Sequence, residues 1–140
     1  MLAKAKKTHP DIEFIFLDAG GDLSEVREKF DIVFSNACIQ WIPDHEMLLP
    51  RLMSLLRNDG VLAVQIPIQS EHPVHIIMNE LVTTAEWKYK LSQRNYNNLS
   101  TSGYYDVLSG ISDDFEIWET IYCHRMPSYE ALLNCTKAQD

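Results

Sequence analysis

The chain has 140 residues, 46% hydrophobic and 23% charged, with a net charge of −8. This length and composition are typical of one folded domain and argue against a disordered chain. The negative charge and the lack of a basic stripe argue against a nucleic-acid partner, whose phosphates require Lys and Arg. No run of eighteen apolar residues and no signal-peptide-like segment occurs, so we expect neither a membrane partner nor export.

The first elements expected along the chain are a helix and two strands. Residues 1–8 are typical of the end of a helix, and the apolar, aromatic-rich run at residues 12–17 predicts a strand. The glycines at residues 20–21 then force a turn. A second strand is expected to begin at residues 32–34 and to end in small and polar residues.

The next expected unit is a helix followed by a third strand. Asp44 is a candidate N-cap for this helix, and Pro50 should either kink it or shift its start toward the C-terminus. Gly60, in a left-handed conformation, is expected to end it. Residues 61–66 form the next predicted strand, so this segment has the order of half a parallel crossover unit.

The second half of the chain predicts three helices and one strand. These are a helix from Pro73 to about residue 91, a short helix at residues 104–108 ending at Gly110, a strand at residues 115–122, and a helix at residues 129–137 capped by Ser128. Residues 95–102 are polar and are expected to form a loop.

Three apolar runs end in small or polar residues, at residues 14–19, 30–41 and 60–67. In open α/β sheets, ligands bind at the carboxyl ends of the strands. These three runs therefore predict one shared ligand edge. The three cysteines, Cys38, Cys123 and Cys135, are widely spaced and fit neither a disulfide framework nor a zinc pattern. We expect reduced thiols, a cytoplasmic location and no metal.

Several blocks of the sequence resemble the class I S-adenosylmethionine-dependent methyltransferases, and within them the trans-aconitate 2-methyltransferase group. The blocks are FDIVFSNA (30–37), QWIPDH (40–45), LLPRL (48–52), GVLAVQIP (60–67), YYD (104–106) and IWETIYCHRMPS (117–128). The resemblance implies an α/β fold, with a partial Rossmann-like sheet flanked by helices. It also implies one incomplete domain over residues 1–140, with a cofactor-edge half (1–67) and a second half made of a helical insert, a strand and a helix (68–140).

Other family features have no counterpart in this chain. The resemblance places residue 1 inside the helix after the family's second strand, so the Gly-rich loop and the ribose-binding acidic residue have no equivalent here. The family's strand order, 3-2-1-4-5-7-6, implies that residues 12–17 have no neighbour to pair with. We therefore expect a fragment, a re-paired sheet, or a homo-oligomer that exchanges elements between copies.

The resemblance assigns cofactor roles to five residues. It implies that Asp18 accepts a hydrogen bond from the adenine amino group and that the Ala19 amide donates to a ring nitrogen. It also implies that Ser35, Asn36 and Ala37 lie against the methionine end of S-adenosylmethionine. The alternatives are an Asx turn at Asp18 and an ordinary strand-to-loop cap at Ser35–Asn36.

The acceptor pocket is expected to involve five further residues: Gln40, Trp41, Tyr104, Tyr105 and Arg125. Gln40 could orient a carboxylate, Trp41 could shield the reacting centre, and Arg125 could pair with a carboxylate. Core packing is the alternative for Trp41, and a surface ion pair is the alternative for Arg125. No catalytic residue is expected, because transfer of a methyl group to a carboxylate needs orientation more than acid–base help.

The predicted activity is methyl transfer from S-adenosylmethionine to a small-molecule acceptor, such as the carboxylate of trans-aconitate, although this chain alone is expected to be inactive. The alternative is a truncated, non-catalytic remnant or interaction module without the Gly-rich cofactor loop. A nucleotide-binding regulator is a third interpretation, which depends only on Asp18 and Ala19.

Overall fold

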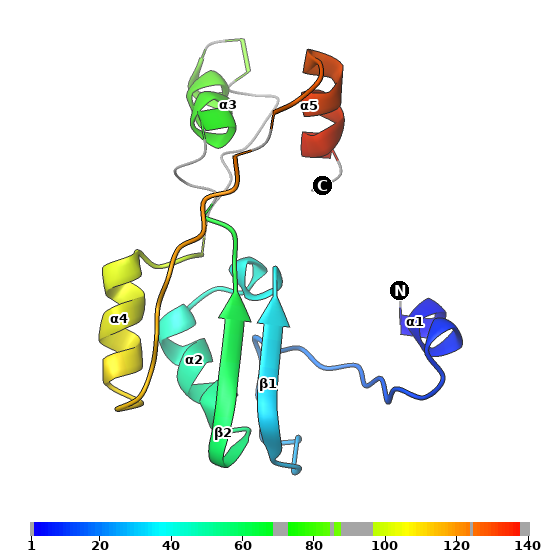
Figure 1. Ribbon diagram of the computed structural model, residues 1–140, viewed down its shortest axis with the longest axis vertical. Coiled ribbons are helices and arrows are strands. Elements are labelled where there is room, and N and C mark those ends of the chain that lie inside the picture. The colour runs from blue at the N-terminus through cyan, green and yellow to red at the C-terminus, as the bar shows by residue number, and fades with distance from the viewer. Residues whose placement is uncertain (1, 69–72, 85, 88–96, 124, 138–140) are drawn as a thin grey trace.

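The computed structural model describes residues 2–68, 73–84, 86–87, 97–123 and 125–137 (Figure 1). Within them, helices and strands alternate through the first half and helices dominate the second. The elements are α1 (Leu2–Thr8), β1 (Phe30–Asn36), the 3-10 turn η1 (Ile39–Trp41), α2 (His45–Met53), β2 (Leu56–Gln65), α3 (Pro73–Thr83), α4 (Thr101–Ser109) and α5 (Tyr129–Lys137).

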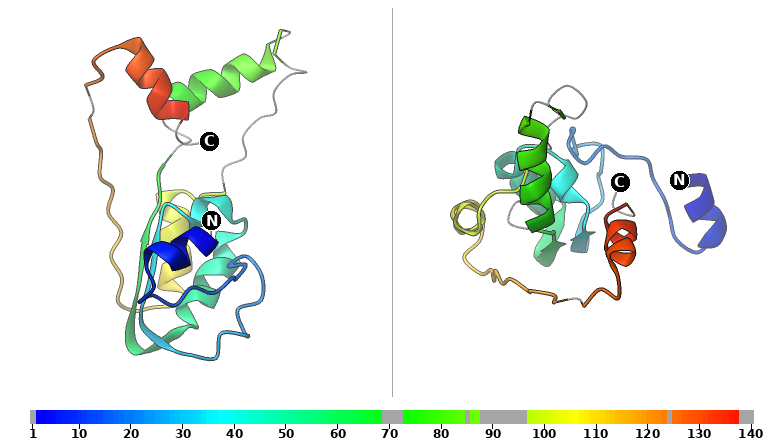
Figure 2. Two further views of the ribbon diagram at one scale, coloured as in Figure 1. Left: turned by 90° about the vertical axis from the view of Figure 1, so that its right-hand side faces the viewer. Right: turned by 90° about the horizontal axis from the view of Figure 1, so that it is seen from above.

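The centre of the structure is a parallel pair of strands, β1 and β2, connected through η1 and α2. Residues 32–36 pair in register with residues 61–65, and the Ala37 amide continues the pairing by donating to the Gln65 carbonyl at 2.9 Å. Helix α2 packs against β2 and α4 (Figure 2). The predicted α/β fold, with a partial parallel sheet flanked by helices, is confirmed. The division at residue 67 stays a prediction.

Helix α2 begins where the sequence predicts but ends earlier. Asp44 caps it by accepting a hydrogen bond from the Met47 amide, and Pro50 lies inside the helix without shifting its start. The prediction that Gly60 ends the helix in a left-handed conformation is wrong, because α2 ends at Met53 and Gly60 lies in β2. Asp59 has the positive φ instead, at 62°. Glycine is needed at position 60 because the backbone of Phe30 in β1 passes close to it there. An added Cβ would lie 3.0 Å from the Phe30 carbonyl oxygen.

Two predicted strands, at residues 12–17 and 115–122, do not form. Both segments are irregular, and within the described residues neither pairs with β1 or β2. Their large apolar side chains are exposed, with Phe16 90% and Trp118 75% accessible. The physical reason is that alternating or apolar patterns favour a strand only when a neighbouring backbone supplies hydrogen bonds.

The predicted helices of the second half are present with changed bounds. Helix α3 covers residues 73–83 of the helix predicted to reach residue 91, whose last residues, 88–91, lie outside the described residues. Helix α4 begins three residues earlier than expected, because Ser100 caps it by accepting from the Gly103 amide at 3.1 Å. Helix α5 has the predicted cap, with Ser128 Oγ accepting from the Ala131 amide at 3.1 Å.

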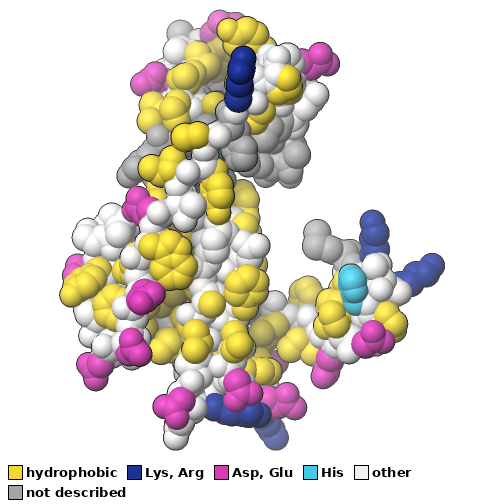
Figure 3. Space-filling view, viewed as in Figure 1, with side chains coloured by type: hydrophobic (Ala, Val, Ile, Leu, Met, Phe, Trp, Pro, Cys, Tyr) yellow, Lys and Arg dark blue, Asp and Glu magenta, His cyan; other side chains and the backbone are white. Residues whose placement is uncertain are grey.

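The hydrophobic core lies between α2, α4 and one face of the sheet. Its buried members are Leu23, Ile39, Leu48, Leu49, Leu52 and Leu55. The opposite face of the sheet is uncovered, so that Ile32, Phe34 and Val61 are exposed (Figure 3). The total accessible surface is 11637 Å², whereas a compact protein of this mass exposes about 7,500 Å². Much of the apolar surface of this chain is therefore not packed within it.

Candidate functional site

The candidate site lies at the carboxyl end of β1, where three small residues turn the chain. Asn36 is the last residue of β1, and Ala37 follows it with a φ of 48°, a conformation that costs a non-glycine residue about 1–2 kcal/mol. Ser35 Oγ is buried, and no hydrogen-bond partner for it lies in the described part of the chain. Leaving a buried hydroxyl without a hydrogen bond costs about 1–3 kcal/mol. The Ser35 hydroxyl is therefore a group at this end of the strand that could form a hydrogen bond with a ligand.

The loop that carries Asp18 and Ala19 lies against the chain just after η1. Asp18 Oδ1 accepts from the Gly20 amide at 2.9 Å, which forms the Asx turn expected as the alternative interpretation. A Cβ added at Gly20 would lie 3.2 Å from Ile42, so the loop contacts the segment that follows η1. The turn and a ligand role are compatible, because the side chain is exposed and has a second oxygen.

Arg51 of α2 holds this loop in place through side-chain hydrogen bonds. Its Nη1 donates to the Gly20 carbonyl at 3.0 Å and to the Gly21 carbonyl at 2.8 Å, while its Nε donates to the Met47 carbonyl. The guanidinium therefore joins the loop to the helix that connects the two strands. In the sequence, Arg51 stands in the family block LLPRL (48–52) with no role assigned to it. Its role could not have been found from spacing, since the partners lie thirty residues away.

The turn η1 presents two side chains in opposite environments. Gln40 is 8% exposed, and its Oε1 is buried without a donor among the described residues. The main-chain carbonyl of Gln40 accepts a hydrogen bond from Asn97 Nδ2 at 3.2 Å. Trp41 is 61% exposed, so it is not a core residue. The neighbouring Asn98 donates to the Pro67 carbonyl at 2.9 Å, which ties the loop before α4 to the chain just beyond β2.

Helix α4 brings only one of its two tyrosines toward η1. The Tyr104 hydroxyl lies 2.6 Å from Nδ1 of His45, the buried first residue of α2. Desolvation by burial raises the pKa of Tyr104 above its ordinary value of 10.0, partly opposed by a backbone hydrogen bond at Leu99. Tyr105 points to another environment, where its ring is exposed and packs edge-on against Phe115 at 5.4 Å.

Within the described part of the chain, no contact joins Arg125 to the other predicted site residues. It is exposed and lies just before α5, which Figure 1 shows beyond the carboxyl ends of the strands. Among the described residues it forms no ion pair. The structure thus gathers the Asp18 loop, η1 and Tyr104 around α2, and leaves Tyr105 and Arg125 outside this group. The turn η1 follows the end of β1 in the chain.

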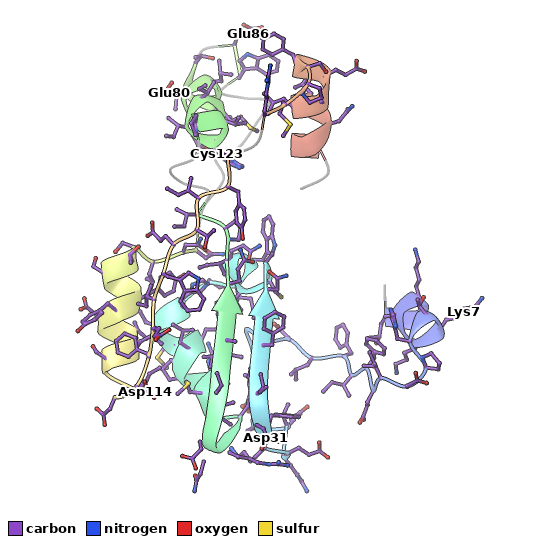
Figure 4. All side chains as sticks on the ribbon, in the orientation of Figure 1. Lys7, Asp31, Glu80, Glu86, Asp114 and Cys123 are labelled. Atoms are coloured by element: carbon purple, nitrogen blue, oxygen red, sulfur yellow. The ribbon has the colours of Figure 1, made fainter. Side chains whose placement is uncertain are left out.

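An open surface groove lies at the other end of the strands and does not belong to this site. It is lined by Glu28, Lys29, Phe30, Asp31, Ile32 and Arg57. Asp31 marks the amino end of β1 in Figure 4 and pairs with Arg57 at 2.9 Å. Ligand crevices of open α/β sheets form at carboxyl ends. Among the described residues no group of three metal-binding side chains occurs, and none of their helices has the length and apolarity to cross a bilayer.

Comparison with known proteins agrees with this geometry. Residues 1–64 match the family described as a methyltransferase domain. The trans-aconitate 2-methyltransferase of Escherichia coli O157:H7 is 37% identical over 139 residues, which are 99% of this chain and 53% of that protein. The enzyme of the same name from Shigella dysenteriae serotype 1 (strain Sd197) is 38% identical over the same shares, and that from Escherichia fergusonii is 37% identical.

These findings confirm the resemblance carried by the sequence blocks: the chain is related to the class I S-adenosylmethionine-dependent methyltransferases. The relatives that it matches along almost its whole length are trans-aconitate 2-methyltransferases. The chain spans about half the length of these curated relatives.

Proposed function

We propose that this chain forms the adenine-side and acceptor-side part of a methyltransferase site, which transfers a methyl group from S-adenosylmethionine to a small-molecule carboxylate such as trans-aconitate. The observation that supports the proposal is the placement of the Asp18 loop, which Arg51 holds beside α2 and which contacts Ile42, just after η1. The acceptor is supported by the relatives of the chain, which are trans-aconitate 2-methyltransferases.

The residues present suit the cofactor in two respects. Asp18 has an exposed carboxylate followed by the Ala19 amide, so an acceptor and a donor stand in adjacent positions, as the paired edge of adenine requires. Ser35 Oγ, which has no hydrogen-bond partner in the described part of the chain, and the small residues Asn36 and Ala37 suit a close approach of the methionine end. When bound, the cofactor supplies an electrophilic methyl group on a sulfonium.

The acceptor side is proposed to lie at η1. Gln40 would orient the acceptor carboxylate and Trp41 would cover it, while Tyr104 would act on this turn through His45. Tyr105 and Arg125 stay predicted acceptor residues, which lie outside the group of residues gathered at η1. An oxygen of the acceptor carboxylate would take the methyl group that bound S-adenosylmethionine would supply, and the electron pair of the broken carbon–sulfur bond would stay on sulfur. No proton moves, so the contribution of the chain is orientation and exclusion of water.

Calorimetric titration with S-adenosylhomocysteine tests this proposal through Asp18→Asn and Asp18→Ala. The Asn variant keeps an oxygen for the Gly20 amide but would present an amino group to the adenine amino group. Loss of a hydrogen bond to a charged group costs about 1.5–3 kcal/mol, so both variants should bind about ten- to a hundredfold more weakly.

Asp22→Asn is the matched control, because Asp22 closes a similar exposed turn by accepting from the Ser24 amide at 2.9 Å. Asp22→Asn should bind S-adenosylhomocysteine with the same affinity as the unmodified chain. If the unmodified chain binds no S-adenosylhomocysteine at millimolar concentration, the proposal fails and the non-catalytic alternative is supported. Equal losses in the Asp18 and Asp22 variants would remove the adenine role of Asp18.

A further inference from the structure

A buried histidine joins two segments that are far apart in the chain. His45 is the first residue of α2 and is 1% exposed. Its Nδ1 lies 2.6 Å from the hydroxyl of Tyr104 in α4, and its Nε2 lies 2.9 Å from the carbonyl oxygen of Ile39 in η1. The imidazole therefore bridges α4 and η1 through both of its nitrogens.

The partners decide which nitrogen donates. The Ile39 carbonyl can only accept, so Nε2 carries the hydrogen. In the neutral ring, Nδ1 is then an acceptor, and the Tyr104 hydroxyl donates to it. Desolvation raises the pKa of that hydroxyl, which keeps its proton available for donation. The two rings stack in a tilted arrangement with centroids 5.8 Å apart.

The bridge acts on the turn that carries the proposed acceptor residues. Residues 39–41 form a single 3-10 turn, and Cys38 before it supplies no side-chain cap. Two side chains hold the turn instead: His45 bonds to the main-chain carbonyl of Ile39, and Asn97 donates to the main-chain carbonyl of Gln40. Gln40 is buried in this turn, and its Oε1 has no hydrogen-bond partner among the described residues. A half-turn of this carboxamide would present its amino group to a carboxylate instead.

We propose that His45 and Tyr104 are positioning residues, which fix the Ile39–Trp41 turn so that the Gln40 carboxamide meets the carboxylate of the acceptor. This inference rests on the proposed function and refines it. The Tyr104 hydroxyl acts through His45 and does not touch the acceptor, and the bridge governs acceptor binding while leaving the cofactor side unchanged.

The test uses the full chain with Tyr104→Phe, His45→Gln and the double variant. Tyr104→Phe removes only the hydroxyl, whereas His45→Gln keeps an N–H donor for the Ile39 carbonyl and removes the ring nitrogen Nδ1 that accepts from Tyr104. Tyr129→Phe is the matched control, because the same atom is lost from an exposed tyrosine at the start of α5. If the His45→Gln variant does not fold, the comparison of Tyr104→Phe with Tyr129→Phe still tests the inference.

Two measurements are made on each variant. Calorimetry with trans-aconitate, in the presence of S-adenosylhomocysteine, should show about tenfold weaker acceptor binding in Tyr104→Phe, as expected for loss of one buried hydrogen bond. Binding of S-adenosylhomocysteine should stay within about twofold, because the Asp18 loop is held separately by Arg51. The amide resonances of Gln40 and Trp41 should shift in Tyr104→Phe and not in Tyr129→Phe.

The double variant separates positioning from direct contact. If Tyr104 acts through His45, its substitution in the His45→Gln background adds almost nothing to the loss of acceptor affinity. Fully additive losses would show that Tyr104 touches the acceptor and would overturn the inference, as would unmoved Gln40 and Trp41 resonances or equal losses of both ligands. If the unmodified chain binds neither ligand, the proposed function fails, whereas the resonances alone still decide whether the bridge holds the turn.

Discussion

The hydrogen bonds from Arg51 to the Asp18 loop make the most specific prediction about the cofactor side of the site. In Arg51→Met, the loop loses the donors to the Gly20 and Gly21 carbonyls, at 3.0 and 2.8 Å. Charge-assisted hydrogen bonds contribute about 1.5–3 kcal/mol each, but this arginine is only partly buried and water replaces part of that energy. We take about 1–3 kcal/mol for the pair together.

This energy sets the expected loss of affinity. If the tethered loop is the conformation that binds S-adenosylhomocysteine, the dissociation constant rises as that conformation loses population. A loss of about 1–3 kcal/mol corresponds to an increase of at most about fivefold to a hundredfold. Arg51→Lys keeps the charge without the planar fork and should lie between the unmodified chain and Arg51→Met.

Arg57→Met is the control for the Arg51 variants. Arg57 pairs with Asp31 at 2.9 Å, both side chains are largely exposed, and the pair lies at the amino end of the strands (Figure 4). An exposed ion pair contributes about 0–1 kcal/mol, and we expect no change in affinity. Calorimetry with S-adenosylhomocysteine measures both variants. Equal affinities of Arg51→Met and Arg57→Met would refute the argument that the tethered loop binds the cofactor.

Two further predictions concern stability. Leu48 is fully buried, whereas Phe34 is 69% exposed. In urea denaturation, the free energy of unfolding should therefore fall by about 2–5 kcal/mol in Leu48→Ala and by less than about 1 kcal/mol in Phe34→Ala. A larger fall in Phe34→Ala would mean that the uncovered sheet face is buried in solution. Because burial raises the pKa of Tyr104 above 10.0, the unfolded chain releases this proton first as the pH rises. Stability should therefore decline above pH 10.0, and Tyr104→Phe should lack that part of the decline; an identical pH profile for both proteins would contradict this.

The elements that the sequence predicted well are those decided by local chemistry. Asp44 and Ser128 cap their helices as expected, because a cap depends on a side chain and an amide three residues away. The strand beginning near residue 32 and its parallel partner also form, since the apolar runs around them end in clear turn signals. The start of the partner strand was wrong, because β2 begins at Leu56 and not at residue 61. Gly60 was misjudged, because the close approach of the Phe30 backbone is invisible in the local sequence.

By itself, the sequence determined the class of fold, the caps, the order of the elements and the family resemblance, all of which depend on neighbouring residues or on ordered blocks. Only the tertiary structure decided which apolar runs become strands: residues 12–17 and 115–122 have the pattern, but a strand forms only beside a backbone that completes its hydrogen bonds. It also decided that Arg51 holds the Asp18 loop and that His45 joins Tyr104 to Ile39. These contacts bring together residues far apart in the chain, and no local propensity encodes them.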